Sequence, residues 1–376
     1  MSRRILQFGT SRFLQAHADL FVHEARQAGQ DIGPITIVKT TQGGPRDGRV
    51  RAFGDPAGYP VGIRGLDKGR VIDESRRITS VARALEASAD WLELTEVFAN
   101  ATDIVFSNVG DSGYAIDPED SKRRPDAGEV PRSFPAKLLA LLALRYERGA
   151  APLLVLPCEL ISDNGRVLRG LLIQLADLWG EGARFKHWLT HEVMICNTLV
   201  DRIVSEAIEP IGAVAEPYAL WAIQREPGLA EPFQHPDVVY VDDLEPYLRL
   251  KLHILNLGHT YIAAIWRTEA RPAAETVREI MADASVRARL QALYNDEVLP
   301  GFAARGLGLQ ARTYRDATLE RFENPFLNHR ISDIFENHAV KVERRAKDFV
   351  SWVHSLDSTL PLPHLEQFAT TTDLPS

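Results

Sequence analysis

The chain has 376 residues, and its 43 Lys and Arg residues against 51 Asp and Glu residues give a net charge of −8. This acidic balance argues against a general nucleic-acid binder, which needs a basic surface, and the length predicts two domains. The two cysteines exclude a disulfide framework and suit a reducing compartment. Apolar runs such as Leu153 to Leu156 are too short to span a bilayer. We therefore expect a cytoplasmic protein with neither membrane nor nucleic-acid partners.

The first half of the chain alternates short apolar runs with amphipathic stretches. The predicted strands are residues 5–8, 35–38, 104–106 and 153–156, and the predicted helices are residues 13–28 and 134–146. Short β-branched strands separated by helices favour a doubly wound, parallel α/β sheet. Residues 41–72, rich in glycine, arginine and aspartate, predict a long loop or an irregular hairpin.

After about residue 196 the pattern becomes mostly helical. The predicted helices are residues 199–207, 248–266, 274–299 and 334–356, and the only clear strand pattern is residues 238–241. We therefore predict an N-terminal Rossmann-like domain over residues 1–195. A mostly α-helical domain over residues 196–376 would carry the catalytic and substrate-binding side chains.

The turn after the first predicted strand reads Gly9-Thr10-Ser11-Arg12-Phe13 and opens a helix. A dinucleotide fold places its phosphate-binding glycines at this point, where backbone N–H groups meet the pyrophosphate. Ser11 occupies the second glycine position of that motif, and it would serve equally well as an ordinary N-cap. Taken alone, the turn slightly favours the N-cap.

The second predicted strand ends at Lys39, where dinucleotide folds usually carry an acid that binds the ribose of NAD. Lys39 could pair with the 2′-phosphate of NADP, or lie on the surface as most lysines do. The residues leave the choice between NAD and NADP open.

The strongest local signal is the segment KLHILNLGH, which contains Lys251, Asn256 and His259. At about 100° per residue, the three side chains fall within roughly 140° on one helix that is otherwise apolar. Lysine is seldom buried without a partner, so this cluster predicts either a polar network or a catalytic site. A second candidate, Asn197, stands at the start of a predicted helix, where an N-cap is the alternative role.

These motifs resemble the polyol-specific long-chain dehydrogenases, the family of mannitol dehydrogenase, mannitol-1-phosphate dehydrogenase and the hexuronate reductases. That family shows K-x-x-x-x-N-x-x-H on a helix, as in residues 251–259, and an asparagine followed by V-D-R-I, as in residues 197–203. The loop of residues 107–114, the segment of residues 321–325 and the later Lys341 are also similar to family motifs.

The resemblance implies metal-independent hydride transfer between a nicotinamide and a secondary alcohol or ketone. It implies Lys251 as the general acid/base, Asn197 and Asn256 as donors to the developing alkoxide, and His259 as a contact to a substrate hydroxyl or to Asn256. The expected cofactor-binding residues are Gly9, Thr10, Ser11, Arg12, Phe13, Lys39, Ser107, Asn108 and Asp111. Lys341 or Arg344 would contact an anionic substrate group.

Within the family, residues 156–165 look most like tagaturonate reductase, whereas the N-x-G-H detail looks more like mannitol-1-phosphate dehydrogenase. We therefore expect a sugar-acid or polyol dehydrogenase of the tagaturonate-to-altronate type, with NAD favoured and NADP open, acting as a monomer or small homo-oligomer. One alternative is a polyol-phosphate dehydrogenase such as mannitol-1-phosphate 5-dehydrogenase. Another is a family member that binds a sugar or nucleotide without turnover. Leu248 stands where some members carry a proton-relay glutamate.

Overall fold

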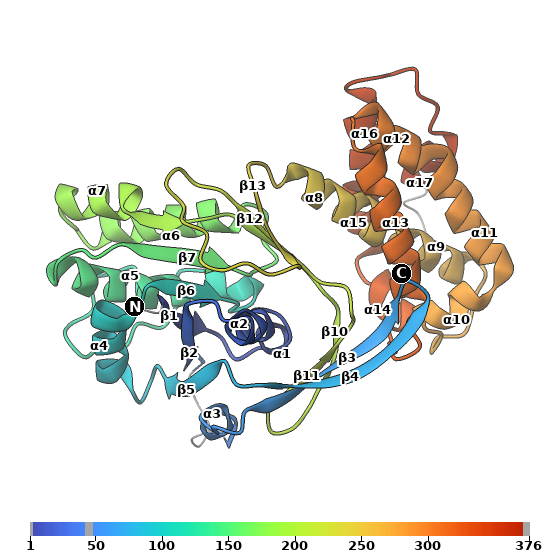
Figure 1. The fold of residues 1–376 in the computed structure, drawn as a ribbon. Helices are drawn as coiled ribbons and strands as arrows, with labels where there is room; N and C mark the ends of the chain where they lie inside the picture. Colours follow the sequence, from blue (N-terminus) through green and yellow to red (C-terminus); the bar gives the residue numbers. More distant parts are fainter. Residues whose placement is uncertain (1–2, 42–47, 371–376) are drawn as a thin grey trace. The chain divides into compact units, whose positions relative to one another are not determined.

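A six-stranded parallel sheet organises the first half of the computed structural model, which describes residues 3–41 and 48–370, except for the side chains of residues 111 and 112. Its strand order is β5-β2-β1-β6-β7-β8 (Figure 1). The strands are β1 (Arg3–Phe8), β2 (Ile32–Lys39), β5 (Val81–Glu86), β6 (Ile104–Ser107), β7 (Leu153–Pro157) and β8 (Val193–Ile195). This is the 3-2-1-4-5-6 order of dinucleotide-binding folds, so the predicted doubly wound sheet is confirmed.

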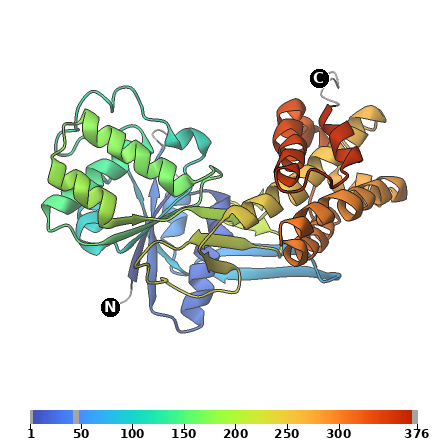
Figure 2. The ribbon, with the colours of Figure 1, turned by 90° about the horizontal axis from the view of Figure 1, so that it is seen from above.

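Helices and a small sheet cover the two faces of this sheet. On one face, a continuous hydrophobic cluster joins the strands to α4 (Trp91–Ala101), α5 (Phe134–Glu147), α6 (Asn164–Leu178) and α7 (Ala183–His191). On the other lie α1 (Arg12–Gln15) and α2 (Ala18–Gln27), together with Trp221, whose ring lies 5.1 Å from that of Phe106 in β6. Figure 2 shows α6 and α7 in green and α2 in blue on opposite sides of the strands.

Residues 198–241 form strands, so the predicted helix over residues 199–207 is wrong. The strands are β9 (Thr198–Asp201), β10 (Val204–Ala207), β11 (Ala213–Ala215), β12 (Leu220–Gln224) and β13 (Val238–Val241). β9 pairs with β12 and β10 with β11, both antiparallel. Leu199, Val200, Ile203 and Val204 recur at a four-residue spacing that imitates a helix, but β-branched side chains favour extended backbone where partner strands are present.

Residues 41–72 are predicted as a long loop or an irregular hairpin, and the structure instead shows a regular hairpin of two nine-residue strands that extends to Ile78. After α3 (Gly48–Phe53), β3 (Tyr59–Asp67) and β4 (Arg70–Ile78) meet at Lys68 and Gly69, which both have positive φ. Two such residues form the tight turn that suits the twist of paired strands. The hairpin belongs to a sheet of order β10-β11-β3-β4, and residues 42–47 lie outside the described part of the chain.

The chain folds into two compact units, described separately below. Unit 1 comprises Met1–Gly62, Ser75–Ala215 and Ala219–Leu244, and unit 2 comprises Ile63–Glu74, Glu216–Tyr218 and Glu245–Ser376. The boundary predicted between residues 195 and 196 falls between β8 and β9, inside unit 1.

Unit 2 is a bundle of helices around one apolar core. Its α-helices are α8 (Glu245–Leu250), α9 (Leu257–Thr268), α10 (Val277–Ala282), α11 (Ala284–Leu293), α12 (Leu299–Ala304), α13 (Gly308–Phe322), α14 (Ile331–Phe335), α15 (His338–Val342), α16 (Asp348–His354) and α17 (Pro363–Thr370). Three π-helical segments interrupt them: η2 (Lys251–Asn256), η3 (Tyr294–Val298) and η4 (Glu343–Lys347). The predicted helix over residues 248–266 is confirmed. Those over residues 274–299 and 334–356 are each broken, at Asp283, which caps α11, and at Asn337, which has a left-handed backbone.

Unit 2 also depends on two segments that precede its helices in the chain, separated from them in sequence. The Glu320 carboxylate accepts hydrogen bonds from the backbone N–H groups of Lys68 (3.1 Å) and Gly69 (2.7 Å) at the hairpin turn. The Arg321 guanidinium forms an ion pair of 2.8 Å with Glu216, and both side chains are at least 96% buried. The hairpin tip and the segment Glu216–Tyr218 are therefore structural parts of the helical bundle.

Asp19, on α2, predicts a measurable pH dependence of stability. Its carboxylate is fully buried and accepts a 2.6 Å hydrogen bond from the Tyr59 hydroxyl, and burial raises its pKa from the ordinary 3.8 to about 7. The folded protein therefore keeps a proton that the unfolded chain releases between about pH 4 and pH 7. Stability is expected to fall as the pH rises through this window, by roughly 4 kcal/mol in total, and to level off above it.

The variant Asp19→Asn removes this titration while keeping an oxygen for the Tyr59 hydroxyl. In urea unfolding at pH 5 and pH 8, we expect the variant to gain stability relative to the wild type at the higher pH. Asp31→Asn, at an exposed position, is the control and should show no such pH-dependent difference. If Asp19→Asn and the wild type keep the same stability difference at both pH values, Asp19 is not the group that titrates.

Candidate active site

The turn at the carboxyl end of β1 is closed tightly against the loop that follows β6. Gly9 has φ +115°, and a Cβ at this position would lie 2.4 Å from the carbonyl oxygen of Asn108. Ser11 caps α1, since its Oγ accepts the Leu14 N–H at 3.2 Å and donates to Asn108 Oδ1 at 2.8 Å. Only glycine fits at residue 9, and the structure brings the predicted residues 9–13 together with Asn108 at the carboxyl edge of the sheet.

A buried carboxylate, which the sequence analysis did not single out, holds the neighbouring loops in place. Glu159, just after β7, accepts hydrogen bonds from the Ser107 hydroxyl (3.0 Å), the Val109 N–H (3.1 Å) and the Tyr114 hydroxyl (3.0 Å). Burial raises the pKa of Glu159, against the lowering effect of these three donors. The predicted cofactor residue Ser107 is thus part of a network that ties the loop after β6 to β7.

Lys39 lies at the carboxyl end of β2, as predicted, and is 9% exposed. Its Nζ is 3.9 Å from Oε1 of Glu86, the last residue of the adjacent strand β5. The negative charge of the Glu86 carboxylate therefore offsets the positive charge of Lys39 that a 2′-phosphate would require as its partner.

Among the other predicted cofactor residues, Asp111 begins a short 3-10 turn, and its side chain lies outside the described part of the chain.

Asn197 joins β8 to β9, so its predicted place at the start of a helix of its own is wrong. Its Oδ1 instead accepts the backbone N–H of Arg166, in the first turn of α6, at 2.9 Å. Its Nδ2 donates to Oε1 of Gln224 at 3.0 Å. The close approach is possible because Gly165 has no Cβ, which would otherwise lie 2.4 Å from the carbonyl oxygen of Cys196. One of the two N–H bonds of the amide is used by Gln224, which leaves a second donor for a ligand.

Lys251 and Asn256 are the first and last residues of the π-helical segment η2, within a helix that runs from Glu245 to Thr268. In α-helical geometry two residues five apart are separated by about 140° around the axis. A π-turn bonds residue i to residue i+5, which places this pair one turn apart on the same side of the helix. His259 follows Asn256 at the i+3 position of α9 and so lies beside it. The π-turn brings the three predicted side chains onto one face.

His259 is buried against aromatic rings and basic groups. Its ring lies 4.4 Å from that of Phe322 and 5.2 Å, edge on, from that of His329. Burial is the main cause that holds its pKa well below 6.5, and the neighbouring cations lower it further. The imidazole is therefore neutral and can exchange hydrogen bonds with a hydroxyl group.

Several basic side chains of unit 2 surround this face. Lys341 is half-buried and donates to the Ile334 carbonyl at 2.7 Å, and burial lowers its pKa, as does Arg345. Arg345 donates to the Asn256 carbonyl at 3.1 Å, and burial lowers its pKa to about 10. Arg344, by contrast, is exposed. The region around His259 carries a positive potential that would favour an anionic ligand.

The structure thus collects the predicted residues into two groups. Gly9, Ser11, Ser107, Asn108 and Asn197 belong to unit 1, whereas Lys251, Asn256, His259 and Lys341 belong to unit 2. Glu159, Arg345 and His329 were not predicted from the sequence. The only sequence signal for Glu159 was its place in residues 156–165, the segment that resembles tagaturonate reductase. The only signal for Arg345 was that it follows Arg344, whose side chain lies on a different side of the helix.

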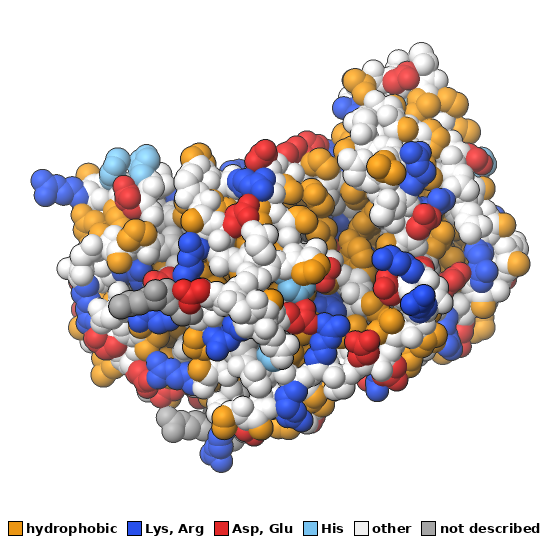
Figure 3. Space-filling model, viewed as in Figure 1, with side chains coloured by type: hydrophobic (Ala, Val, Ile, Leu, Met, Phe, Trp, Pro, Cys, Tyr) orange, Lys and Arg blue, Asp and Glu red, His pale blue; other side chains and the backbone are white. Residues whose placement is uncertain are grey.

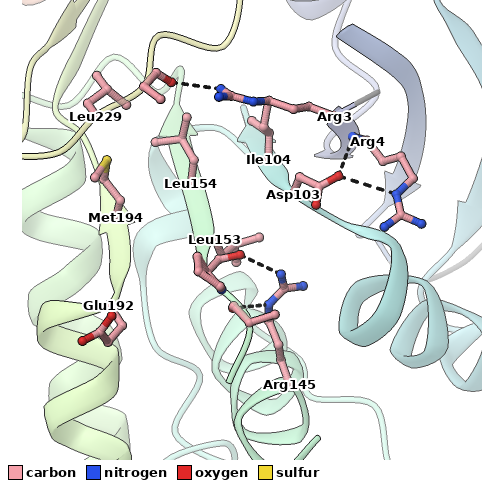
Figure 4. A pocket seen from close by; sticks show the side chains of 13 residues that line it. Arg3, Arg4, Asp103, Ile104, Arg145, Leu153, Leu154, Glu192, Met194 and Leu229 are labelled. Atoms are coloured by element: carbon pink, nitrogen blue, oxygen red, sulfur yellow. Dashed lines mark hydrogen bonds and ion pairs between the residues drawn. The ribbon is translucent and has the colours of Figure 1, made fainter. Parts of the chain in front are cut away.

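A cavity of about 460 Å³ lies at the opposite, amino-terminal edge of the sheet (Figure 4). Its arginines are already bound: Arg3 to the Ala230 carbonyl at 2.9 Å, and Arg4 to Asp103 at 3.5 Å. Arg145 donates to the carbonyls of Phe98, Ala151 and Pro152. These guanidinium groups fasten loops at the start of the strands, so the cavity is separate from the dinucleotide edge.

The surface in Figure 3 mixes basic and acidic side chains over the face that it displays. Among the described residues, no group of three His, Cys, Asp or Glu side chains could hold a metal ion. In the same residues no helix is both long and apolar enough to cross a membrane.

A Rossmann-ordered sheet with a glycine turn, followed by a helical unit with a Lys–Asn–His face, defines a two-domain dehydrogenase. Residues 3–233 match the model of the mannitol dehydrogenase Rossmann domain, and residues 243–357 match that of the mannitol dehydrogenase C-terminal domain. The chain belongs to the mannitol dehydrogenase family. It is therefore an oxidoreductase of the class that acts on sugar acids or polyols.

The relatives and solved structures agree with this assignment. An altronate oxidoreductase of Halalkalibacterium halodurans is 31% identical over 92% of this chain and 70% of that protein, and one of Yersinia pestis is 33% identical over 91% and 73%. The fold is similar to a substrate-free D-sorbitol dehydrogenase, with TM-score 0.80, 20% identity and coverage of 93% and 76%. It is also similar to Pseudomonas fluorescens mannitol 2-dehydrogenase in complex with NAD and D-mannitol, with TM-score 0.71, 20% identity and coverage of 98% and 84%.

Proposed function

We propose that this protein is an NAD-dependent hexuronate reductase that interconverts tagaturonate and altronate. The observation that carries the proposal is the Lys251–Asn256–His259 face on its π-turn, set among basic side chains in a relative of altronate oxidoreductases. A sugar acid carries a carboxylate, which the positive potential around His259 would stabilise. An uncharged polyol would gain nothing from these cations.

The proposed chemistry assigns one role to each side chain. Bound NAD or NADH supplies the hydride acceptor or donor. Lys251 takes the proton from the alcohol during oxidation and returns it to the alkoxide during reduction. Asn197 and Asn256 donate amide N–H bonds to the oxygen that becomes negative. His259, held neutral, accepts or donates a hydrogen bond to a substrate hydroxyl.

The residues of unit 1 fit a dinucleotide. Gly9 has no Cβ, so the turn after β1 packs against the loop of Ser107 and Asn108 at the carboxyl edge of the sheet, where dinucleotide folds bind the pyrophosphate. The carboxylate of Glu86 offsets the positive charge of Lys39, and this supports NAD rather than NADP as the cofactor. We include Thr10, Arg12, Phe13 and Asp111 in this proposed cofactor site.

A panel of substrates tests the proposal. Tagaturonate, fructuronate, fructose and fructose 6-phosphate are each offered with NADH and with NADPH, while nicotinamide absorbance is followed. We expect kcat/KM with NADH to be highest for tagaturonate. Preference for the phosphate would identify a polyol-phosphate dehydrogenase instead, and binding of a sugar without turnover of any substrate would identify a non-catalytic member.

Lys341 is proposed to pair with the substrate carboxylate, with Arg344 as a further contact. Lys341→Met should raise KM for a hexuronate by about 10- to 100-fold, since a hydrogen bond to a charged group contributes about 1.5–3 kcal/mol. The KM for an uncharged ketose should change little. Lys347→Met, an exposed lysine on the same π-helical segment as Arg344, is the control. An unchanged KM for tagaturonate in Lys341→Met would exclude this contact.

A further inference from the structure

The π-turn that aligns Lys251 with Asn256 is held by groups outside its own helix. π-helical turns are rare, because they disturb the regular i to i+4 ladder of backbone hydrogen bonds. A turn of this kind therefore needs external partners for the carbonyls that it displaces. In η2 the Ile254 carbonyl, which also accepts the Leu257 N–H, and the Asn256 carbonyl, which also accepts the Thr260 hydroxyl, each accept a further hydrogen bond from a side chain of another helix.

Tyr294 provides the partner on one side. It is completely buried, and its hydroxyl donates to the Ile254 carbonyl, in the middle of η2, at 2.7 Å. Burial raises the pKa of Tyr294 well above its usual value, so the hydroxyl keeps its proton over the whole working range of pH. The bond joins η3 to η2 across the core of unit 2.

Gly258 makes room for this hydroxyl. A Cβ at residue 258 would lie 2.0 Å from the Tyr294 oxygen and 3.1 Å from the carbon that carries it. Any other residue at this position would displace the hydroxyl from the Ile254 carbonyl. The glycine of the N-x-G-H sequence therefore has a packing function.

Arg345 provides the partner on the other side. Its guanidinium donates to the Asn256 carbonyl at 3.1 Å and to the Thr260 hydroxyl at 2.8 Å. The backbone carbonyl of Arg345 accepts a hydrogen bond from Nδ1 of His253 at 3.0 Å. η2 is thus fixed at its middle by η3 and at its end by η4.

We propose that Tyr294 is a positioning residue of the active site: its hydroxyl, admitted by Gly258, maintains the π-turn that places Lys251 and Asn256 on one face. The proposal rests on the catalytic roles proposed above for those two residues. Without the hydroxyl, η2 can relax towards α-helical geometry, in which the pair diverges by about 140°. The expected loss is in kcat rather than in KM.

Tyr294→Phe removes only the oxygen. The matched control is Tyr240→Phe in unit 1, where a buried tyrosine hydroxyl also donates to a backbone carbonyl, that of Phe233, at 2.9 Å. With tagaturonate and NADH, we expect kcat to fall tenfold or more in Tyr294→Phe with KM within about twofold, and to stay unchanged in Tyr240→Phe. Amide hydrogen exchange of the cofactor-free protein should become faster in peptides covering residues 251–259 in Tyr294→Phe alone.

The variant Gly258→Ala tests the same contact from the other side. It should lower kcat strongly in the wild type but much less in the Tyr294→Phe background, where the hydroxyl is gone and only the 3.1 Å contacts of the new Cβ to the Phe322 ring and to Cζ of residue 294 remain. Additive losses in the double variant would overturn the proposal. So would unchanged exchange at residues 251–259, unchanged kcat in Tyr294→Phe, or an equal loss in Tyr240→Phe. The exchange measurement needs no substrate, so it separates failure of this proposal from failure of the proposed reaction.

Discussion

Replacement of Lys251 by alanine is expected to lower the rate of the chemical step by about 10²–10⁴-fold in both directions. The variant removes the group on the π-turn face that is proposed to move a proton to or from the substrate oxygen. The turn itself should remain, because Tyr294 and Arg345 hold it through backbone carbonyls rather than through the lysine. Binding of NADH, followed by its fluorescence, should be unchanged because Lys251 lies in unit 2.

Single-turnover kinetics with NADH and tagaturonate would measure this loss directly. Added primary amines should restore part of the rate, because they can replace the missing proton donor. Lys186→Met, at a surface lysine paired with Asp177, is the control and should keep full activity. Near wild-type turnover of Lys251→Ala in both directions would remove the lysine from the mechanism.

Conversion of either Asn197 or Asn256 to aspartate is expected to lower kcat by roughly a hundredfold or more. If the proposed roles hold, each change replaces an N–H donor with a carboxylate beside the oxygen that becomes negative, which penalises the transition state more than substrate binding. At residue 197 an aspartate oxygen can still accept the Arg166 N–H that caps α6, and Gln224 can turn its amide to donate, although it then loses its own bond to the Asp242 carbonyl. The fold should therefore survive.

The control compares Asn197→Asp with Asn197→Ala. The alanine variant loses the cap on α6 as well as the donor, so it should be less stable by about 1 kcal/mol. If the amide had only a structural role, the aspartate variant would keep both its stability and its turnover. Thermal unfolding and steady-state kinetics together distinguish the two cases, and Asn100→Asp, at an exposed residue, corrects for the added charge.

Strands β1, β2, β6 and β7 of the parallel sheet could be predicted because they contain short apolar runs in which local preference and burial agree, whereas β5, which carries Arg83 and Glu86, and the three-residue β8 were not predicted. In a chain that alternates them with helical patterns, residues 5–8 and 153–156 are expected to be stable as strands of a buried parallel sheet. β9 and β10 could not be predicted, because Val200 and Val204 satisfy the spacing of both a helix and a strand. Only pairing of β9 with β12 and of β10 with β11, both later in the chain, decides between them.

The candidate site was predictable in its residue types but not in its geometry. Lys251, Asn256 and His259 stand out because polar groups are rare on so apolar a helix. The π-turn produces no comparable signal in the sequence. Because η2 is apolar on several sides, a rotation of its residues around the helix axis does not change the hydrophobic pattern. Arg345, within the π-helical segment η4, contacts the helix of Lys251 whereas Arg344 is exposed, and a sequence pattern of constant period does not show which of the two arginines is buried.

The split composition of unit 2 limits how the protein can be rebuilt by recombination. A graft of residues 245–376 onto another nucleotide-binding half would leave behind both the hairpin tip and Glu216. Arg321 would then be a buried guanidinium without its carboxylate, a defect that typically costs about 3–5 kcal/mol. A functional exchange between relatives must therefore carry three stretches of chain together: residues 63–74, 216–218 and 245 onward.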